Sequence, residues 1–199
     1  MQKLPPEIIQ IVLELLYASY VTPDWSSFHR LSLVCKVWSW YAQALLYCHV
    51  RVETKKQIHA FWDATNPMWN RGRRLGEAVR VLRISLHEDE TPDSLSTNKI
   101  MQNDLPKTMR HCPRLHELRV TLDGVRSFSD ETMLHLQHTP PITALCVTDS
   151  VPDGEAARQL LYVWPSVKHL VLRSMSINTG YAGGNFRRSM QKLLNISST

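Results

Sequence analysis

Residues 115–122 read LHELRVTL, in which Leu118, Val120 and Leu122 alternate with polar residues. A period of two is typical of a β-strand with one buried face. Three further segments share its core of an apolar residue, two spacers, Leu, one spacer, and Val, Ile or Leu: VRVLRISL at 79–86, ITALCV at 142–147 and VKHLVL at 167–172. When the four segments are aligned on the shared Leu, the equivalent residues are Leu82, Leu118, Leu145 and Leu170. The intervals between them are 36, 27 and 25 residues. These intervals indicate a strand–helix solenoid.

The stretches between the strand-like segments have helical character. Apolar residues at helical spacing occur in residues 97–112 and 153–164, and Ser129 can cap a helix that begins at Asp130. A last helix is expected around residues 186–194, after a Gly-rich turn at 180–184. Stacked strand–helix units bury each other's apolar faces, and about three or more are needed for stability. We therefore expect an α/β chain whose residues 77–199 form about four such units.

The first fifty residues predict a separate helical module. Apolar residues recur every three or four positions within residues 4–20, 25–34 and 35–46, which is the pattern of amphipathic helices. Pro5 and Pro6 fit the first turn of the first helix, where a missing N–H has no cost. We therefore expect residues 1–50 to form three helices.

Residues 51–76 are predicted to connect the two parts. The sequence HVRV at 49–52 alternates like a short strand, and residues 55–64 have a helical pattern. Trp69 to Arg74 is expected to be a polar connector, and its cluster Arg71, Arg73 and Arg74 to be solvated.

Composition limits the classes of partner. The chain has 199 residues, of which 43% are apolar, and a formal net charge of +5. It is therefore basic, but it lacks the clusters of Lys, Arg and aromatic residues that are typical of a nucleic-acid binder. Neither a secretory signal nor an apolar run long enough to span a bilayer is recognisable. The four cysteines, at 35, 48, 112 and 146, lack zinc-type spacing. We expect free thiols in a reducing compartment, and neither a nucleic-acid nor a membrane partner.

No catalytic motif stands out. The cluster His87-Glu88-Asp89-Glu90 is expected to be an acidic solvated loop, and His135 and His138 have no third metal ligand nearby in the sequence. The chain contains neither a phosphate-binding GxxxxGK[ST] loop nor a GxSxG elbow. We therefore expect a binding protein without cofactor, metal or enzymatic activity, although a triad assembled across the fold stays open.

Two stretches of the helical module resemble a known family. Residues 4–16, LPPEIIQIVLELL, and residues 31–42, LSLVCKVWSWYA, together resemble the F-box, a three-helix motif that docks on a Skp-family adaptor of cullin-type ubiquitin ligases. The family pattern is a Leu-Pro-x-Glu start with aliphatics behind it, and a Val-Cys-basic finish followed shortly by Trp. The segment from Tyr17 to Ser27 is several residues longer than in the compact family pattern, as in many fungal F-box proteins. Degenerate leucine-rich repeats often follow F-boxes.

The resemblance implies a substrate-recognition adaptor in the cytoplasm or nucleus, with a Skp-family adaptor and through it a cullin scaffold as partners. The residues that it assigns to adaptor binding are Leu4, Pro5, Ile8, Ile9, Val12, Val34, Cys35 and Trp38. The alternative is that this apolar stripe is only the module's own core, and for Trp38 an internal position is favoured over partner contact.

The repeat region would then bind a protein target whose identity the sequence does not give. Candidate positions alternate outward from the core side of the strands: Arg83, His116, Glu117, Arg119, Lys168 and Arg173. Solvated strand positions of this kind usually have no partner. Two other functions stay open, a leucine-rich-repeat scaffold without a ligase role and a small α/β enzyme.

Overall fold

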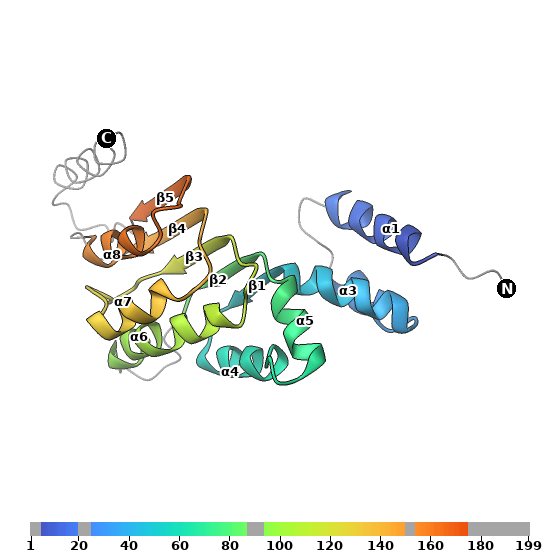
Figure 1. Ribbon diagram of the computed structural model, residues 1–199, viewed down its shortest axis with the longest axis horizontal. Helices are drawn as coiled ribbons and strands as arrows, with labels where there is room; N and C mark the ends of the chain where they lie inside the picture. Colours follow the sequence, from blue (N-terminus) through green and yellow to red (C-terminus); the bar gives the residue numbers. More distant parts are fainter. Residues whose placement is uncertain (1–4, 20–24, 87–93, 150–153, 175–199) are drawn as a thin grey trace.

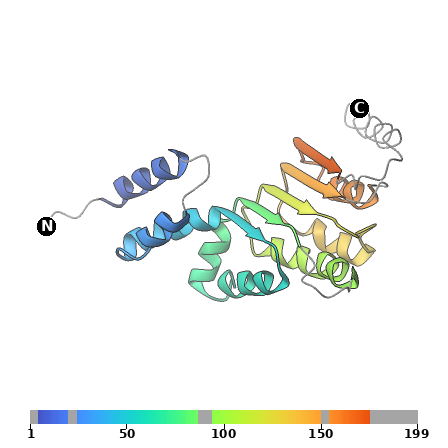
Figure 2. The ribbon, with the colours of Figure 1, turned by 180° about the vertical axis from the view of Figure 1, so that it is seen from behind.

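The computed structural model describes residues 5–19, 25–86, 94–149 and 154–174. Within them the chain forms an N-terminal helical module, followed by a parallel β-sheet that has helices on one face (Figures 1 and 2). The predicted α/β class is therefore confirmed. Among the described residues, no helix is both long and apolar enough to cross a bilayer.

The helical module consists of α1 (Pro6–Ser19), α2 (Trp25–Leu31) and α3 (Lys36–Cys48). Its own small core contains Ile9, Leu13, Phe28 and Ala42, one or two residues from each helix. The second helix ends at Leu31 rather than at the predicted Val34, because residues 32–34 form a turn in which the Val34 N–H donates to the Leu31 carbonyl at 3.2 Å. The helix α3 leads directly into the first strand.

The sheet contains β1 (His49–Val52), β2 (Val81–Ile84), β3 (Glu117–Thr121), β4 (Ala144–Asp149) and β5 (His169–Ser174). All neighbouring strands are parallel, and their order in the sheet is their order in the sequence. The register pairs Leu82 with Leu118, Leu118 with Leu145 and Leu145 with Leu170, so the repeat alignment is confirmed. Val50 of β1 pairs with Leu82 and adds a fifth strand to the row.

Four helices cover one face of this sheet: α4 (Lys55–Ala64), α6 (Ser94–Arg110), α7 (Asp130–Gln137) and α8 (Glu155–Val163) (Figures 1 and 2). Their apolar side chains pack against the strand residues that alternate inward, such as Leu82, Leu118 and Leu145, to form the main core. As predicted, Ser129 caps α7, accepting from the Thr132 N–H at 3.2 Å. The opposite face carries the outward-alternating residues.

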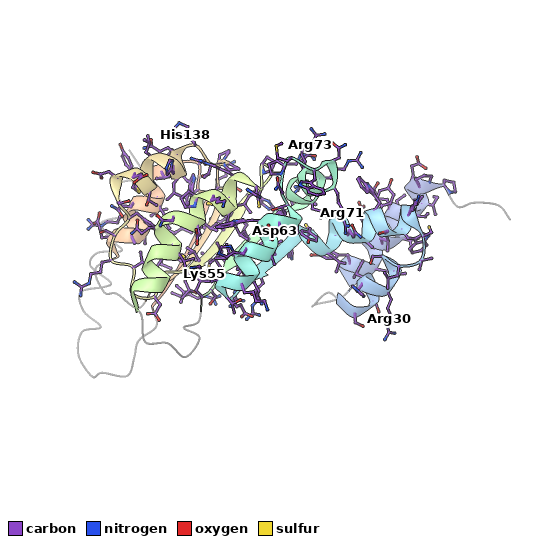
Figure 3. All side chains as sticks on the ribbon, turned by 90° about the horizontal axis from the view of Figure 1, so that it is seen from below. Arg30, Lys55, Asp63, Arg71, Arg73 and His138 are labelled. Atoms are coloured by element: carbon purple, nitrogen blue, oxygen red, sulfur yellow. The ribbon has the colours of Figure 1, made fainter. Side chains whose placement is uncertain are left out.

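The expected polar connector at residues 69–74 is wrong, since Trp69 is the N-cap of α5 (Asn70–Ala78) and the other residues belong to this helix. Arg74 lies 4.0 Å over the Trp40 ring, and Arg71 donates to the Gln43 side chain at 3.5 Å, so both hold α5 against α3. Arg71 and Arg73 extend from this helix, and Arg73 is exposed as expected (Figure 3).

Several sequence predictions fall on residues that the structure does not describe. These are Leu4, the acidic cluster at 87–90, the Gly-rich turn at 180–184 and the last helix at 186–194.

Candidate functional site

An apolar surface on the outside of α1 is the first candidate. Ile8, Ile11, Val12 and Leu15 are exposed, Leu15 by 65%, and their spacings of three, four and seven residues place them on one side of the helix. Ile9 and Leu13 face the module's core instead. The polar side is narrow, and two of its members, Gln10 and Glu14, hydrogen-bond to each other at 2.7 Å. The apolar face of α1 is thus wider than the part that the module buries.

The turn between α2 and α3 carries a second group of exposed apolar side chains. Leu33 and Val34 are exposed by 73% and 64%, and Val37 and Trp40 follow on the first turns of α3. The N-terminal ends of α1 and α3 both point away from the sheet (Figures 1 and 2). Fully burying one such aliphatic side chain contributes about 1.5–3 kcal/mol. The described chain leaves several such side chains of the helical module exposed, so their burial does not stabilise the chain by itself.

These residues account for most of the exposed large apolar side chains. Among the described residues there are fourteen, and nine lie between Ile8 and Trp40. Scattered apolar side chains on a surface need no explanation, but a concentration on one element marks an interaction site. We call the exposed apolar residues of α1, of the α2–α3 turn and of the first turns of α3 the module surface.

The predicted adaptor-binding residues divide between this surface and the core. Pro5, Ile8, Val12, Val34 and Cys35 are exposed, whereas Leu4 lies outside the described residues. Ile9 is only 5% exposed and packs with Leu13, Phe28 and Ala42, so in this chain it belongs to the module's core, and its direct contact with an adaptor stays a prediction. Trp38 is half-buried against the same core, in line with the internal position favoured for it.

Sequence reasoning missed several members of the module surface, namely Ile11, Leu15, Leu33, Val37 and Trp40. The spacing of apolar residues was visible, but it gave no information on which side of the stripe packs inside. A signal did exist in α1, because its apolar residues cover more of the helix than one neighbouring helix can bury.

A polar contact ties the module to the sheet. The Tyr17 hydroxyl lies 3.0 Å from His49 Nδ1, and the Tyr17 ring packs edge-on against Phe28 with centroids 5.8 Å apart. Burial, with a smaller effect of Cys48, raises the pKa of Tyr17 to about 12, and burial lowers the pKa of His49. A neutral phenol can therefore donate to a neutral imidazole. This contact has a structural role, because it holds α1 against the start of β1.

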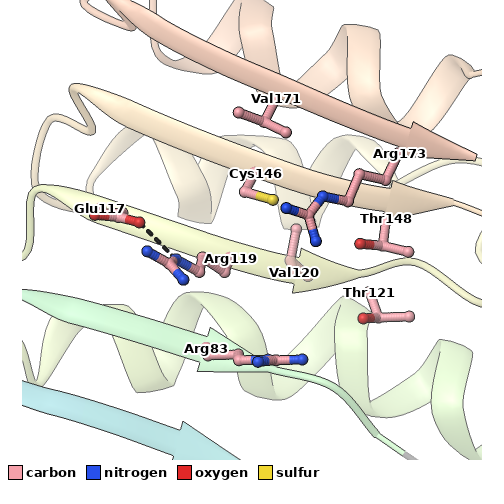
Figure 4. A pocket seen from close by; sticks show the side chains of 9 residues that line it. All are labelled: Arg83, Glu117, Arg119, Val120, Thr121, Cys146, Thr148, Val171 and Arg173. Carbon is pink, nitrogen blue, oxygen red and sulfur yellow. Dashed lines mark hydrogen bonds and ion pairs between the residues drawn. The ribbon is translucent and has the colours of Figure 1, made fainter. Parts of the chain in front are cut away.

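The open face of the sheet is the second candidate. The register places Arg51, Arg83 and Arg119 side by side on β1, β2 and β3, and Cys146 and Val171 continue the same row. Arg51 pairs with Glu53, and Arg119 donates to Glu117 at 2.6 Å. Part of this face is a hollow of about 210 Å³ (Figure 4), lined by Arg83, Glu117, Arg119, Val120, Thr121, Cys146, Thr148, Val171 and Arg173.

The predicted outward positions agree in part with this arrangement. Arg83, Glu117, Arg119 and Arg173 line the hollow, whereas His116 and Lys168 precede their strands and do not line it. Arg51, which was missed, belongs to the same row because β1 is a full member of the sheet.

Residues with catalytic or metal-binding chemistry are dispersed. In residues 5–19, 25–86, 94–149 and 154–174, no three His, Cys, Asp or Glu side chains are grouped so that they could hold a metal ion. His135 Nδ1 accepts from Arg110 at 3.0 Å, while His138 Nδ1 lies 2.8 Å from the Leu134 carbonyl. Burial raises the pKa of the Cys112 thiol to about 12, so this thiol stays protonated.

Comparison with known proteins finds no matching family model, no matching curated protein and no matching solved structure. The module surface and the open sheet face are therefore interpreted from their own geometry, apolar character and charge.

Proposed function

We propose that this chain is a substrate-recognition adaptor of a cullin-type (Skp–cullin–F-box) ubiquitin ligase. The observation that supports the proposal is the module surface, a concentration of exposed apolar side chains on the residues whose sequence resembles an F-box. The chain would perform no chemistry. It would raise the effective concentration of a target protein near a ubiquitin-charged enzyme, in the cytoplasm or nucleus.

In this proposal, α1 and the start of α3 dock on helices of the Skp-family adaptor, which links the chain to a cullin scaffold. Ile8 and Val12 of α1 and Val34 beside α3 are the anchors, because they are apolar, exposed and fixed by a packed module. Binding energy is usually concentrated in a few such central side chains. The sheet and its helices form a short leucine-rich-repeat-like solenoid that binds the target.

Val34→Asp tests the docking directly. The variant replaces an exposed side chain, so the fold should persist, but in the complex it would bury an unpaired carboxylate. A buried unpaired charge costs about 3–5 kcal/mol, which corresponds to at least a hundredfold weaker binding. Isothermal titration with a purified Skp-family adaptor measures the change. The matched control is Met68→Asp, since Met68 is 88% exposed and lies outside the module surface.

The exposed Cys35 thiol gives a second measurement. Docking should cover it and slow its labelling by iodoacetamide, whereas the rate at Cys146, on the sheet, should not change. If the unaltered chain binds no Skp-family adaptor at micromolar concentration, or if Val34→Asp and Met68→Asp bind it equally well, the adaptor proposal is wrong.

A second candidate is a leucine-rich-repeat scaffold without a ligase role, in which the helical module caps the array. The continuity of α3 with β1 favours it, because the Arg80 N–H donates to the Cys48 carbonyl at 2.9 Å and joins the end of α3 to the next repeat. A capping module needs no exposed apolar surface, however. If the unaltered chain binds no Skp-family adaptor in the titration above, this candidate becomes the leading one.

A further inference from the structure

The three arginines of the open face stand on neighbouring parallel strands at the same register position. Adjacent strands lie about 4.8 Å apart, and like charges directly opposite each other destabilise a sheet. Carboxylates relieve two members of the row, Glu53 at Arg51 and Glu117 at Arg119. Within the described part of the chain, Arg83 and Arg173 have no ion pair. Positive charge on this face therefore exceeds what the described fold neutralises.

The excess charge is concentrated at the hollow. Figure 4 shows Arg173 extending from β5 back over β4 toward Cys146, while Arg119 and Arg83 lie on β3 and β2. Cys146 and Val171 form an apolar strip on the β4–β5 side of the hollow, and the Thr148 side chain lies beside it. The guanidinium groups of Arg83, Arg119 and Arg173 thus lie along one side of this strip (Figure 4).

We propose that this hollow binds an acidic segment of a protein, with carboxylates on Arg83 and Arg173 and a neighbouring aliphatic side chain on Cys146 and Val171. The guanidinium fork pairs with a carboxylate through two parallel hydrogen bonds, which gives the contact direction as well as attraction. The inference rests on the proposed function in one respect only, namely that the bound segment belongs to the target of a ligase.

The composition of the hollow favours a peptide over a nucleic acid. Proteins that hold single-stranded nucleic acid combine basic residues with aromatic side chains on which the bases stack. None of the described residues that line the hollow is aromatic. An acidic peptide can place its carboxylates on the arginines and its aliphatic side chain on the apolar strip.

Fluorescence polarisation with the full chain tests the proposal. The probe is fluorescein-labelled Glu-Glu-Val-Glu-Glu, and its counterpart is Gln-Gln-Val-Gln-Gln, which has the same length without the charge. We expect the acidic probe to bind and the neutral one to bind at least tenfold more weakly. Arg83→Ala and Arg173→Ala should each weaken binding of the acidic probe by about tenfold, as expected for loss of a charge-assisted hydrogen bond.

Two matched variants separate specific contacts from net charge. Arg51→Ala removes an arginine from the same row, but Arg51 pairs with Glu53 and does not line the hollow, so binding should change less than threefold. Arg83→Lys keeps the charge and loses the fork, and should weaken binding to a smaller extent than Arg83→Ala. Since all these side chains are exposed, unfolding midpoints should match that of the unaltered chain.

Three results would overturn the proposal: equal binding of the two peptides, equal effects of Arg51→Ala and Arg83→Ala, or displacement of the acidic probe by polyuridylate at lower concentration than by unlabelled peptide. Failure here is distinguishable from failure of the proposed function. Val34→Asp should leave peptide binding unchanged, and Arg83→Ala should leave adaptor binding unchanged, so each surface is judged by its own ligand.

Discussion

Replacing Gly76 by Ala tests how α5 is fitted between its neighbours. In the interior of a helix, Ala is favoured over Gly by about 1 kcal/mol, so helix propensity alone predicts a more stable protein. A Cβ atom at position 76 would lie only 2.1 Å from the backbone carbonyl oxygen of His111, against a practical limit of 3.0 Å. At least 0.9 Å of movement is therefore required.

That movement is expensive, because the obstacle is backbone. His111 directly follows α6, and its neighbours Met109 and Cys112 are fully buried in the main core. Overpacking a well-packed site costs about 1–3 kcal/mol or more. We place Gly76→Ala near the upper end of this range, so that the cost exceeds the propensity gain and leaves a net loss of about 2 kcal/mol.

Urea denaturation followed by circular dichroism at 222 nm measures the difference in free energy of unfolding. In thermal unfolding, the same loss of about 2 kcal/mol should lower the midpoint temperature of a chain of this size by roughly 4–8 °C. Arg73→Ala is the control, since Arg73 is exposed on the same helix and its change should stay within about 0.5 kcal/mol. If Gly76→Ala stabilises the protein instead, α5 does not approach His111 as closely as described.

Two further predictions concern polar side chains at the end of α6, the buried Thr108 and the half-buried His111. Thr108→Val should lower the free energy of unfolding by about 1–3 kcal/mol, because the buried Trp62 Nε1–H, which donates to Thr108 Oγ1 at 3.0 Å, loses its acceptor; an unchanged urea midpoint would refute this. Burial, with a smaller contribution from Lys107, lowers the pKa of His111 below its usual 6.5. The unfolded chain then binds the proton more readily, so stability should fall as the pH drops below about 6.5. His111→Gln should flatten that pH dependence in urea denaturation series from pH 7 to 5, and an unchanged slope would contradict the assignment.

The sequence predicted the sheet better than the helices that flank it. The four Leu positions that the sequence repeat aligns are the ones that pair in register, because parallel strands of similar strand–helix units place equivalent residues side by side. The helix α5 was missed because Gly72 and Gly76 lower its helix propensity. Both glycines lie where a Cβ would meet backbone, 2.2 Å from the Asn66 carbonyl oxygen in the case of Gly72. Tertiary packing explains them, and a single sequence contains no sign of that packing.

The candidate sites were less predictable, for a related reason. Periodicity shows that Ile8 and Ile9 belong to one apolar stripe, but only the packing of α1 on its neighbours determines that Ile9 is buried and Ile8 exposed. Predicting the arginine row would have required the register of three strands whose arginines are 32 and 36 residues apart in the sequence. The segment of β1 was predicted to be a short strand, but it was not assigned to the repeat array. Both surfaces are formed by contacts between segments that lie far apart in the sequence.

Both proposed surfaces share one physical property, which is that each is unfavourable for the chain alone. The module surface leaves apolar side chains in water, and the arginine row places like charges on neighbouring strands whose backbones lie about 4.8 Å apart. Neither arrangement contributes to the cores, which are complete without them. A partner that covers apolar surface and a partner that brings negative charge would each relieve one of these costs. The module surface lies on α1, on the α2–α3 turn and on α3, whereas the arginine row and the hollow lie on the sheet. The two surfaces therefore have no residue in common, so one chain could hold both partners at once, as the proposed adaptor function requires.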